Sequence, residues 1–101
     1  MKILIVDDSK AMRMIVKRTL KQAGFGDATM AEATNGREGL EAIKADTPDL
    51  VLCDWNMPEM TGIELLRALR AEGNEVKFGF VTSEGTNEMR QQAQDSGALF
   101  L

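Results

Sequence analysis

The sequence predicts an α/β fold, a doubly wound parallel sheet of five strands with helices on both faces. Apolar runs such as residues 3–6 and 50–53 contain no polar residue, as expected of strands buried on both faces. Segments with helical spacing lie between these runs, so strands and helices alternate along the chain. At 101 residues the chain suits one domain and is too short for a closed barrel, which needs about 250 residues.

The first strand is predicted at residues 3–6, and a helix follows it. Ser9 is a residue type that caps helices, and Gly24 is suited to ending one. The apolar residues between them recur at the spacing of a helix. These residues are Met12, Ile15, Val16, Leu20 and Ala23.

A weaker second strand is predicted at residues 28–33. Asn35 followed by Glu38 is typical of a helix start, because the two side chains can cap each other's backbone N–H groups. The helix that begins there is expected to end before Pro48, since the residue preceding a proline disfavours helical backbone.

The second half of the chain repeats the pattern. The buried strand at 50–53 ends at Asp54, and Thr61 with Glu64 forms a capping box for the next helix. The remaining elements are a strand at 76–82, a short polar helix at 86–96 and a fifth strand that begins at 98.

Charge and composition exclude several classes of function. The chain has no histidine and one cysteine, which excludes most zinc sites, histidine-based catalytic triads and internal disulfides. The net charge is −4 without a basic run to offset it, so direct nucleic-acid binding is not expected. Asp7 and Asp8 interrupt the first apolar run, which is too short for a secretory signal or a membrane span. We therefore expect a cytoplasmic protein.

Polar residues follow three of the predicted strands. Asp7 and Asp8 come after the first strand and Asp54 after the third, while Thr82 ends the fourth. The carboxyl ends of parallel strands meet at one sheet edge, where open sheets bind ligands. Taken singly, each residue has a structural explanation: Asp8 and Ser9 suit a helix cap, Asp54 a turn, and Thr82 a strand.

Together these residues predict a cation site with a nucleophile. Three carboxylates at one edge repel one another unless a cation neutralises them, and oxygen ligands favour Mg²⁺. The backbone carbonyl of Asn56, in the loop after Asp54, is a further candidate ligand. With Mg²⁺ present, Asp54 is the predicted nucleophile toward a phosphoryl donor, and Thr82 offers a hydroxyl to a phosphoryl oxygen.

The ordered set of motifs resembles the receiver domains of two-component response regulators. The matching stretches are Ile3-Leu4-Ile5-Val6-Asp7-Asp8, then Asp49-Leu50-Val51-Leu52-Cys53-Asp54-Trp55-Asn56-Met57-Pro58 with Thr61-Gly62, then Val81-Thr82-Ser83 and Gly97-Ala98. The resemblance runs over the whole chain. Residues 11–13 and 54–58 resemble the chemotaxis type most closely.

The resemblance implies a flavodoxin-like sheet with strand order 2-1-3-4-5. It implies Mg²⁺ bound by Asp7, Asp8, Asp54 and the Asn56 carbonyl. Asp54 would accept phosphate from the histidine of a kinase or phosphotransfer protein, and Thr82 would sense it. The surface at residues 84–95, which a downstream target protein reads, would then shift. Such a domain is a self-phosphorylating and self-dephosphorylating switch rather than a turnover enzyme.

Two features of the family lie outside this sequence. By the usual spacing, a lysine that contacts the phosphoryl group would lie three residues beyond Leu101, and the closing fifth helix would follow it. We therefore expect residues 1–101 to form a receiver truncated within or just after the fifth strand. The bare sheet surface that remains would be covered by a partner or by dimerisation. Leu101 stands where many members have a switchable aromatic residue, and Phe100 is adjacent.

Two other functions stay open. A degenerate receiver that acts only as a protein-interaction module is favoured by the missing lysine and disfavoured by the intact acidic residues. An aspartate-nucleophile phosphohydrolase fits Asp54 but needs a second acid two residues along, where Asn56 cannot serve as a general acid.

The side chains around these motifs have structural explanations. Cys53 is expected to pack inertly in its strand, and Trp55 either packs in its loop or contacts a partner. The basic residues of the first predicted helix are expected to form one solvated face. They lie at positions 10, 13, 17, 18 and 21.

Overall fold

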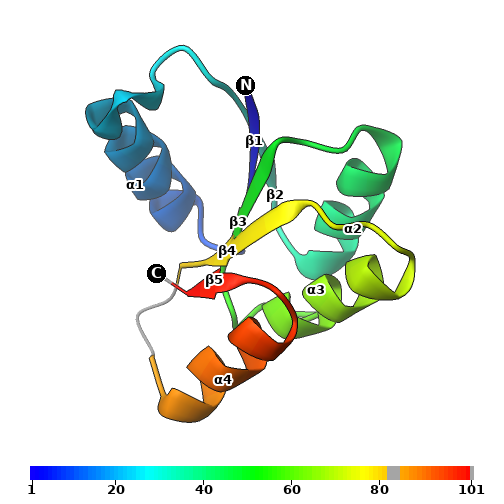
Figure 1. Cartoon of the computed structure of the whole chain (residues 1–101). Coiled ribbons are helices and arrows are strands. Elements are labelled where there is room, and N and C mark those ends of the chain that lie inside the picture. Colours follow the sequence, from blue (N-terminus) through cyan, green and yellow to red (C-terminus); the bar gives the residue numbers. More distant parts are fainter. Residues whose placement is uncertain (82–84, 101) are drawn as a thin grey trace.

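A computed structural model of the chain describes residues 1–81 and 85–100, and Figure 1 shows its elements. The strands are β1 (Lys2–Val6), β2 (Thr29–Ala33), β3 (Leu50–Cys53), β4 (Lys77–Phe80) and β5 (Leu99–Phe100). The helices are α1 (Lys10–Leu20), α2 (Gly36–Ala45), α3 (Gly62–Ala71) and α4 (Asn87–Asp95), with a π-helical turn, η1 (Lys21–Phe25), after α1. The strands are all parallel and lie in the order β2-β1-β3-β4-β5, which confirms the predicted fold class and strand order.

The helix starts form as the sequence predicts. The Ser9 side chain accepts a hydrogen bond from the Met12 N–H, and the Asn35 side chain accepts one from the Glu38 N–H. Thr61 and Glu64 make a reciprocal capping box at the start of α3. Each cap satisfies backbone N–H groups that the helix itself leaves unpaired, so local sequence fixes where these helices begin.

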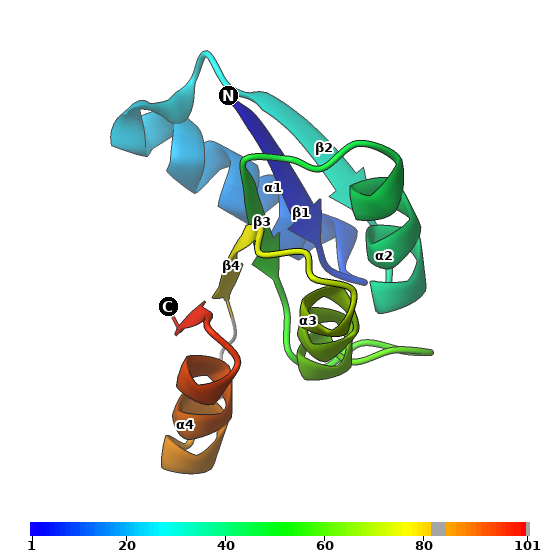
Figure 2. The same cartoon turned by 45° about the vertical axis from the view of Figure 1, so that its right-hand side comes forward.

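The two faces of the sheet carry different amounts of helix (Figures 1 and 2). Helices α2 and α3 cover one face, where a large buried cluster contains Phe78, Phe80 and three leucines of α3. On the other face lies α1, and the buried cluster beneath it is small: Ile3, Ile5, Val16 and Leu52. Within the described residues no helix is long and apolar enough to cross a membrane.

The apolar stripe of α1 is less buried than its periodicity predicts. Val16 is buried, but Ile15 is 51% exposed and Met12 is 37% exposed. These side chains border an open apolar groove of about 270 Å³ between α1 and the sheet. The groove is lined by Met12, Ile15, Val16, Thr19, Leu20, Leu52 and Val81. These side chains stay partly uncovered because α1 is the only described helix on this face (Figure 2).

Arg70, near the end of α3, joins two turns at the edge of the sheet. Its guanidinium donates hydrogen bonds to the carbonyl oxygens of Asn74 (2.9 Å) and Val76 (3.0 Å) in the turn before β4. It also donates to the carbonyls of Ser96 (3.2 Å) and Gly97 (3.1 Å) in the turn before β5. One side chain therefore holds the starts of β4 and β5 against α3.

Candidate cation and phospho-acceptor site

Three carboxylates meet at the carboxyl edge of the sheet. Asp7 and Asp8 follow β1, and Asp54 follows β3, which pairs with β1 through Val6 and Cys53. Asp7, Asp8 and Asp54 each place an oxygen within 4.8 Å of the others. The predicted convergence of these residues is therefore present. Asp7 is buried, Asp54 is half-buried and Asp8 is exposed, so the cluster opens to solvent on one side.

Backbone hydrogen bonds hold the acidic residues in place. The Asp7 N–H donates to the Ala33 carbonyl (3.1 Å), and the Asp54 N–H donates to the Val6 carbonyl (2.9 Å). These bonds extend the β1–β2 and β1–β3 pairing by one residue. The Asp7 carboxylate accepts from the Ser9 N–H (2.9 Å), and the Asp54 carboxylate accepts from the Trp55 N–H (2.8 Å).

The surroundings favour protonation of two of the carboxyl groups. Burial raises the pKa of Asp54, and the Asp7 charge raises it further, against the opposing effect of the Trp55 N–H. Burial also raises the pKa of Asp7, with the charge of Asp8 adding to it against the Ser9 N–H. Without a cation, ionisation of these groups at neutral pH therefore opposes folding.

Asp54→Asn is expected to stabilise the metal-free protein at neutral pH. Because the folded-state pKa of Asp54 is raised, the folded chain binds this proton more tightly than the unfolded chain. The favourable contribution is therefore complete at low pH and is lost as pH rises through the raised pKa. Two unit charges 4 Å apart repel by about 1 kcal/mol even in water, so we expect a gain of about that size.

Urea denaturation of the metal-free variants at pH 7 and near pH 3.5 measures this effect. The gain from Asp54→Asn should shrink at the lower pH, where the wild-type carboxyl is protonated too. Asp27→Asn, at an exposed turn residue, is the matched control. A loss of stability in Asp54→Asn at pH 7 would contradict the repulsion described here.

The donor set fits a hard divalent cation. The clustered ligand atoms are carboxylate oxygens, which Mg²⁺ prefers, and the exposed side leaves room for the waters that it retains. Asn56 is exposed two residues after Asp54, and its backbone carbonyl stays a predicted ligand. Thr82, the predicted phosphoryl sensor, and Leu101 lie outside the described residues.

The sequence model of the response regulator receiver domain matches residues 3–100 of this chain. The chain belongs to the response regulator receiver family. This receiver is 41% identical over 99 residues to the chemotaxis protein CheY of Pseudomonas aeruginosa and to CheY-3 of Vibrio cholerae. The matches cover 96% of this chain and 78% and 75% of those two relatives.

Solved receiver structures share the fold. The receiver domain of the Francisella response regulator 1452 aligns with a TM-score of 0.87 at 27% identity, covering 99% of this chain and 81% of that one. The chemotaxis protein CheY4 of Vibrio cholerae aligns with a TM-score of 0.83 at 34% identity, covering 98% and 82%. The protein is thus a CheY-like receiver domain of two-component signalling.

The loop after Asp54 packs closely onto the receiver core. Trp55 is buried, and its ring centroid lies 4.8 Å from that of Phe80. Gly62 donates its N–H to the Trp55 carbonyl (2.8 Å). A Cβ on Gly62 would overlap the Asp54 carbonyl oxygen and lie 2.8 Å from the Phe80 ring. Gly62 thus allows the β3–α3 loop to close against the end of β3, and Trp55 packs internally rather than facing a partner.

Gly62→Ala is expected to destabilise the receiver by about 1–3 kcal/mol, the usual cost of overpacking a close contact. The added methyl group must displace both the Asp54 carbonyl and the Phe80 ring. Urea denaturation monitored by Trp55 fluorescence measures the change. Gly26→Ala is the matched control, because a Cβ there meets nothing within 4 Å. Equal stabilities for the two variants would contradict the close approach at Gly62.

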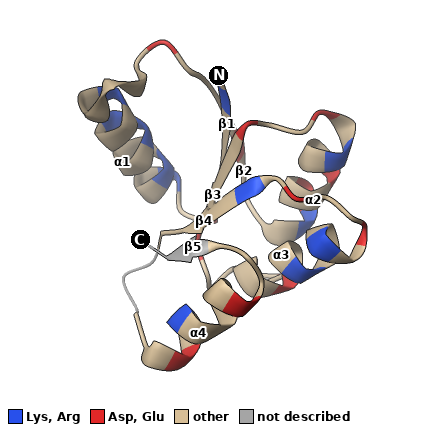
Figure 3. Cartoon of the chain, in the orientation of Figure 1, with Lys and Arg blue, Asp and Glu red and all other residues tan. Residues whose placement is uncertain are grey.

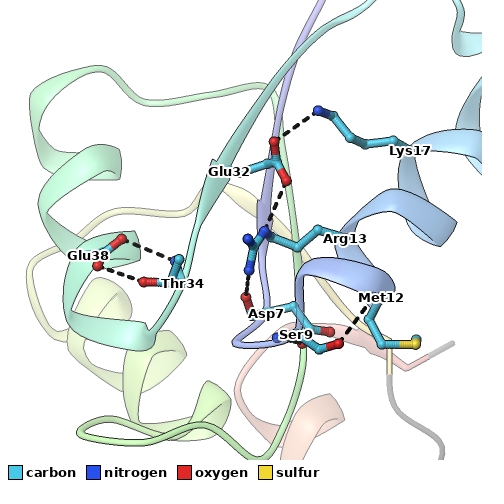
Figure 4. A network of polar contacts seen from close by, with 8 residues as sticks. All are labelled: Asp7, Ser9, Met12, Arg13, Lys17, Glu32, Thr34 and Glu38. Atoms are coloured by element: carbon cyan, nitrogen blue, oxygen red, sulfur yellow. Dashed lines mark hydrogen bonds and ion pairs between the residues drawn. The ribbon is translucent and has the colours of Figure 1, made fainter.

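Arg13 is the residue of the site region that the sequence interpretation placed wrongly. It was expected on a solvated basic face, yet its side chain is 11% exposed and contacts Asp7 and Glu32 (Figure 4). The available signal was its spacing: residues 13, 16 and 20 lie on one helix face, and Val16 is buried. Arg13 therefore belongs to the core-facing side of α1.

Proposed function

We propose that this receiver accepts a phosphoryl group on Asp54 in a Mg²⁺-dependent His-Asp phosphorelay. The observation that carries the proposal is the convergence of three carboxylates at the ends of neighbouring strands, in a chain that belongs to the receiver family. Asp7 and Asp8, with Asp54 and the Asn56 carbonyl, are the proposed cation ligands. Bound Mg²⁺ would neutralise charge on the cluster and on the incoming phosphoryl group.

The chain's residues have separate roles in the proposed transfer. A carboxylate oxygen of Asp54 attacks phosphorus, the bond from phosphorus to the donor histidine nitrogen breaks, and an acyl phosphate forms. The Trp55 N–H donates a hydrogen bond to Oδ1 of Asp54 and fixes the orientation of the carboxylate during the attack. The Ser9 N–H does the same for Asp7. The chain thus supplies orientation, and the kinase or phosphotransfer protein supplies the phosphoryl group.

Labelling with a small phosphoryl donor tests the proposal. With Mg²⁺ present, the wild type should gain one phosphoryl group that hydroxylamine removes, as expected of an acyl phosphate. Peptide mapping should place it on Asp54, and Asp54→Asn should remain unlabelled. Asp27→Asn, which lies away from the cluster, should label like the wild type.

Each other outcome points to a different function. A folded wild type that binds Mg²⁺ and takes no label would favour the module that acts through protein contacts alone. Steady release of phosphate from a phosphomonoester would favour the phosphohydrolase. A label on any residue other than Asp54 would overturn the assignment of the acceptor.

We propose α4 and the segment before it as the output surface. Most side chains of α4 are polar and exposed, and Ala93 is the buried anchor of the helix. Thr82 is the proposed link between the phosphoryl group and this surface, which a downstream target would read. Thr82→Ala should still be labelled on Asp54 but lose the gain in target affinity. Equal target affinity for the phosphorylated wild type and Thr82→Ala would refute this role.

We propose the groove beside α1 as the surface through which two copies of the chain associate. The groove is apolar, and α1 carries Lys and Arg but no acidic residue (Figure 3). Ile15→Glu should reduce binding of an apolar dye and any concentration-dependent mass in sedimentation. A wild type that sediments as a monomer without binding the dye would refute this surface.

A further inference from the structure

Arg13 contacts the site region at two points (Figure 4). Its Nη1 donates to the backbone carbonyl of Asp7 at 2.7 Å, and its Nε donates to the Glu32 carboxylate at 2.9 Å. Glu32 lies on β2 and also accepts from Lys17 at 2.9 Å. The guanidinium is therefore fixed between the end of β1, strand β2 and the first turns of α1.

These contacts immobilise the backbone that carries two of the acidic residues. The Asp7 N–H is held by the Ala33 carbonyl, the Asp7 carboxylate by the Ser9 N–H, and the Asp7 carbonyl by Arg13. The Asp7 carbonyl belongs to the peptide bond that leads into Asp8. The orientation of this peptide bond sets the direction in which the backbone presents the exposed Asp8 side chain, whose carboxylate lies near that of Asp54.

We infer that Arg13 is a positioning residue for the cation site, acting through the Asp7–Asp8 peptide bond. This inference rests on the proposed function for its significance, since it concerns the ligands of the proposed Mg²⁺. Two nitrogens of one planar group make the two contacts, an arrangement that the single ammonium of lysine cannot reproduce. Groups that orient metal ligands commonly change metal affinity by about 10–100-fold.

The positive charge of Arg13 and its positioning of the Asp7–Asp8 peptide bond have opposite effects on Mg²⁺ affinity. A positive charge near the cluster disfavours a cation, so its removal alone tightens Mg²⁺ binding. Loss of the hydrogen bond to the Asp7 carbonyl lets the Asp7 and Asp8 side chains move, which weakens Mg²⁺ binding. The direction of the change in affinity therefore separates a positioning role from a purely electrostatic one.

Arg13→Met and Lys17→Met form a matched pair for the test. Each variant removes one positive charge from α1 and one partner from Glu32, but only Arg13 contacts the Asp7 carbonyl. Mg²⁺ titration followed by Trp55 fluorescence should show about tenfold weaker binding for Arg13→Met. Lys17→Met should bind as tightly as the wild type or more tightly. Arg13→Lys, which keeps the charge, should still bind more weakly than the wild type.

A second measurement uses the metal-free protein and separates this inference from the proposed function. Hydrogen exchange of the Ser9 amide, which donates to Asp7, should become several-fold faster in Arg13→Met and stay unchanged in Lys17→Met. If the wild type binds no Mg²⁺, the proposed function fails, and the exchange result alone decides the role of Arg13. Unchanged Ser9 exchange, or Mg²⁺ binding in Arg13→Met as tight as in Lys17→Met, would overturn the inference. If Arg13→Met does not fold, Arg13→Lys supplies both measurements.

Discussion

Replacing Phe80 with alanine is expected to lower the free energy of unfolding by about 3–5 kcal/mol, the range for a fully buried phenylalanine. Phe80 has no exposed surface. Its ring contacts Phe78 edge-on at a centroid distance of 5.2 Å and Trp55 at 4.8 Å. The variant leaves a cavity beneath the loop that follows Asp54, so Trp55 should also gain solvent exposure. Urea denaturation gives the stability, and a red shift of native Trp55 emission reports the loosened loop.

Phe25→Ala is the control for the Phe80 variant. Phe25 is 40% exposed in the turn after α1, so its truncation should cost less than about 1 kcal/mol and leave Trp55 emission unchanged. Similar losses of stability at the two positions would show that the packing of Phe80 against Phe78 and Trp55 contributes no more than that of an exposed side chain. A large loss of stability in Phe80→Ala without a change in Trp55 emission would show that Phe80 stabilises the core but does not hold the loop after Asp54 in place.

Arg70→Met is expected to destabilise the protein by about 2–4 kcal/mol. Methionine keeps most of the apolar stem of the side chain, so the change isolates the guanidinium. That group donates to four backbone carbonyls in the turns before β4 and β5. A hydrogen bond from a charged donor contributes about 1.5–3 kcal/mol, and partial hydration of the freed carbonyls reduces the sum.

Arg67→Met is the matched control on the same helix. Arg67 is exposed and donates one hydrogen bond of 3.3 Å, to the side chain of Gln92. We expect a change within about 0.5 kcal/mol, as for other surface substitutions. Hydrogen exchange should show faster opening of β5 in Arg70→Met alone. An equal effect of both variants would mean that the carbonyl contacts of Arg70 contribute no net stability.

The features predicted correctly are those that local sequence determines. Ser9, Asn35 and Thr61 cap helices through residues three positions away, so the signal lies within one turn. The meeting of Asp7 with Asp54 follows from a general rule, because parallel strands that are buried on both faces bring their carboxyl ends to one edge. The strand order came from the family resemblance and is confirmed by the sheet pairing.

The features that sequence reasoning missed depend on contacts between distant segments. Arg13 and Arg70 each have basic neighbours on the same helix. The spacing of Arg13 with Val16 was the one local signal of its burial, whereas only the tertiary fold distinguishes Arg70 from an exposed side chain. Ile15 has the spacing of a core residue, but a stripe is buried only where another element covers it. Gly62 resembles an ordinary first residue of a helix until its distance to the Asp54 carbonyl is known.

Cys53 gives this receiver a built-in probe of opening kinetics at the site. It is the only cysteine of the chain, it is 1% exposed, and it immediately precedes Asp54. Burial raises the pKa of its thiol well above the ordinary value, so the native state presents almost no thiolate to a labelling reagent. Reaction at Cys53 therefore requires β3 to detach from its neighbours, and its rate reports how often that happens. Comparing that rate with and without Mg²⁺ measures how far a bound cation suppresses this opening, without any engineered cysteine.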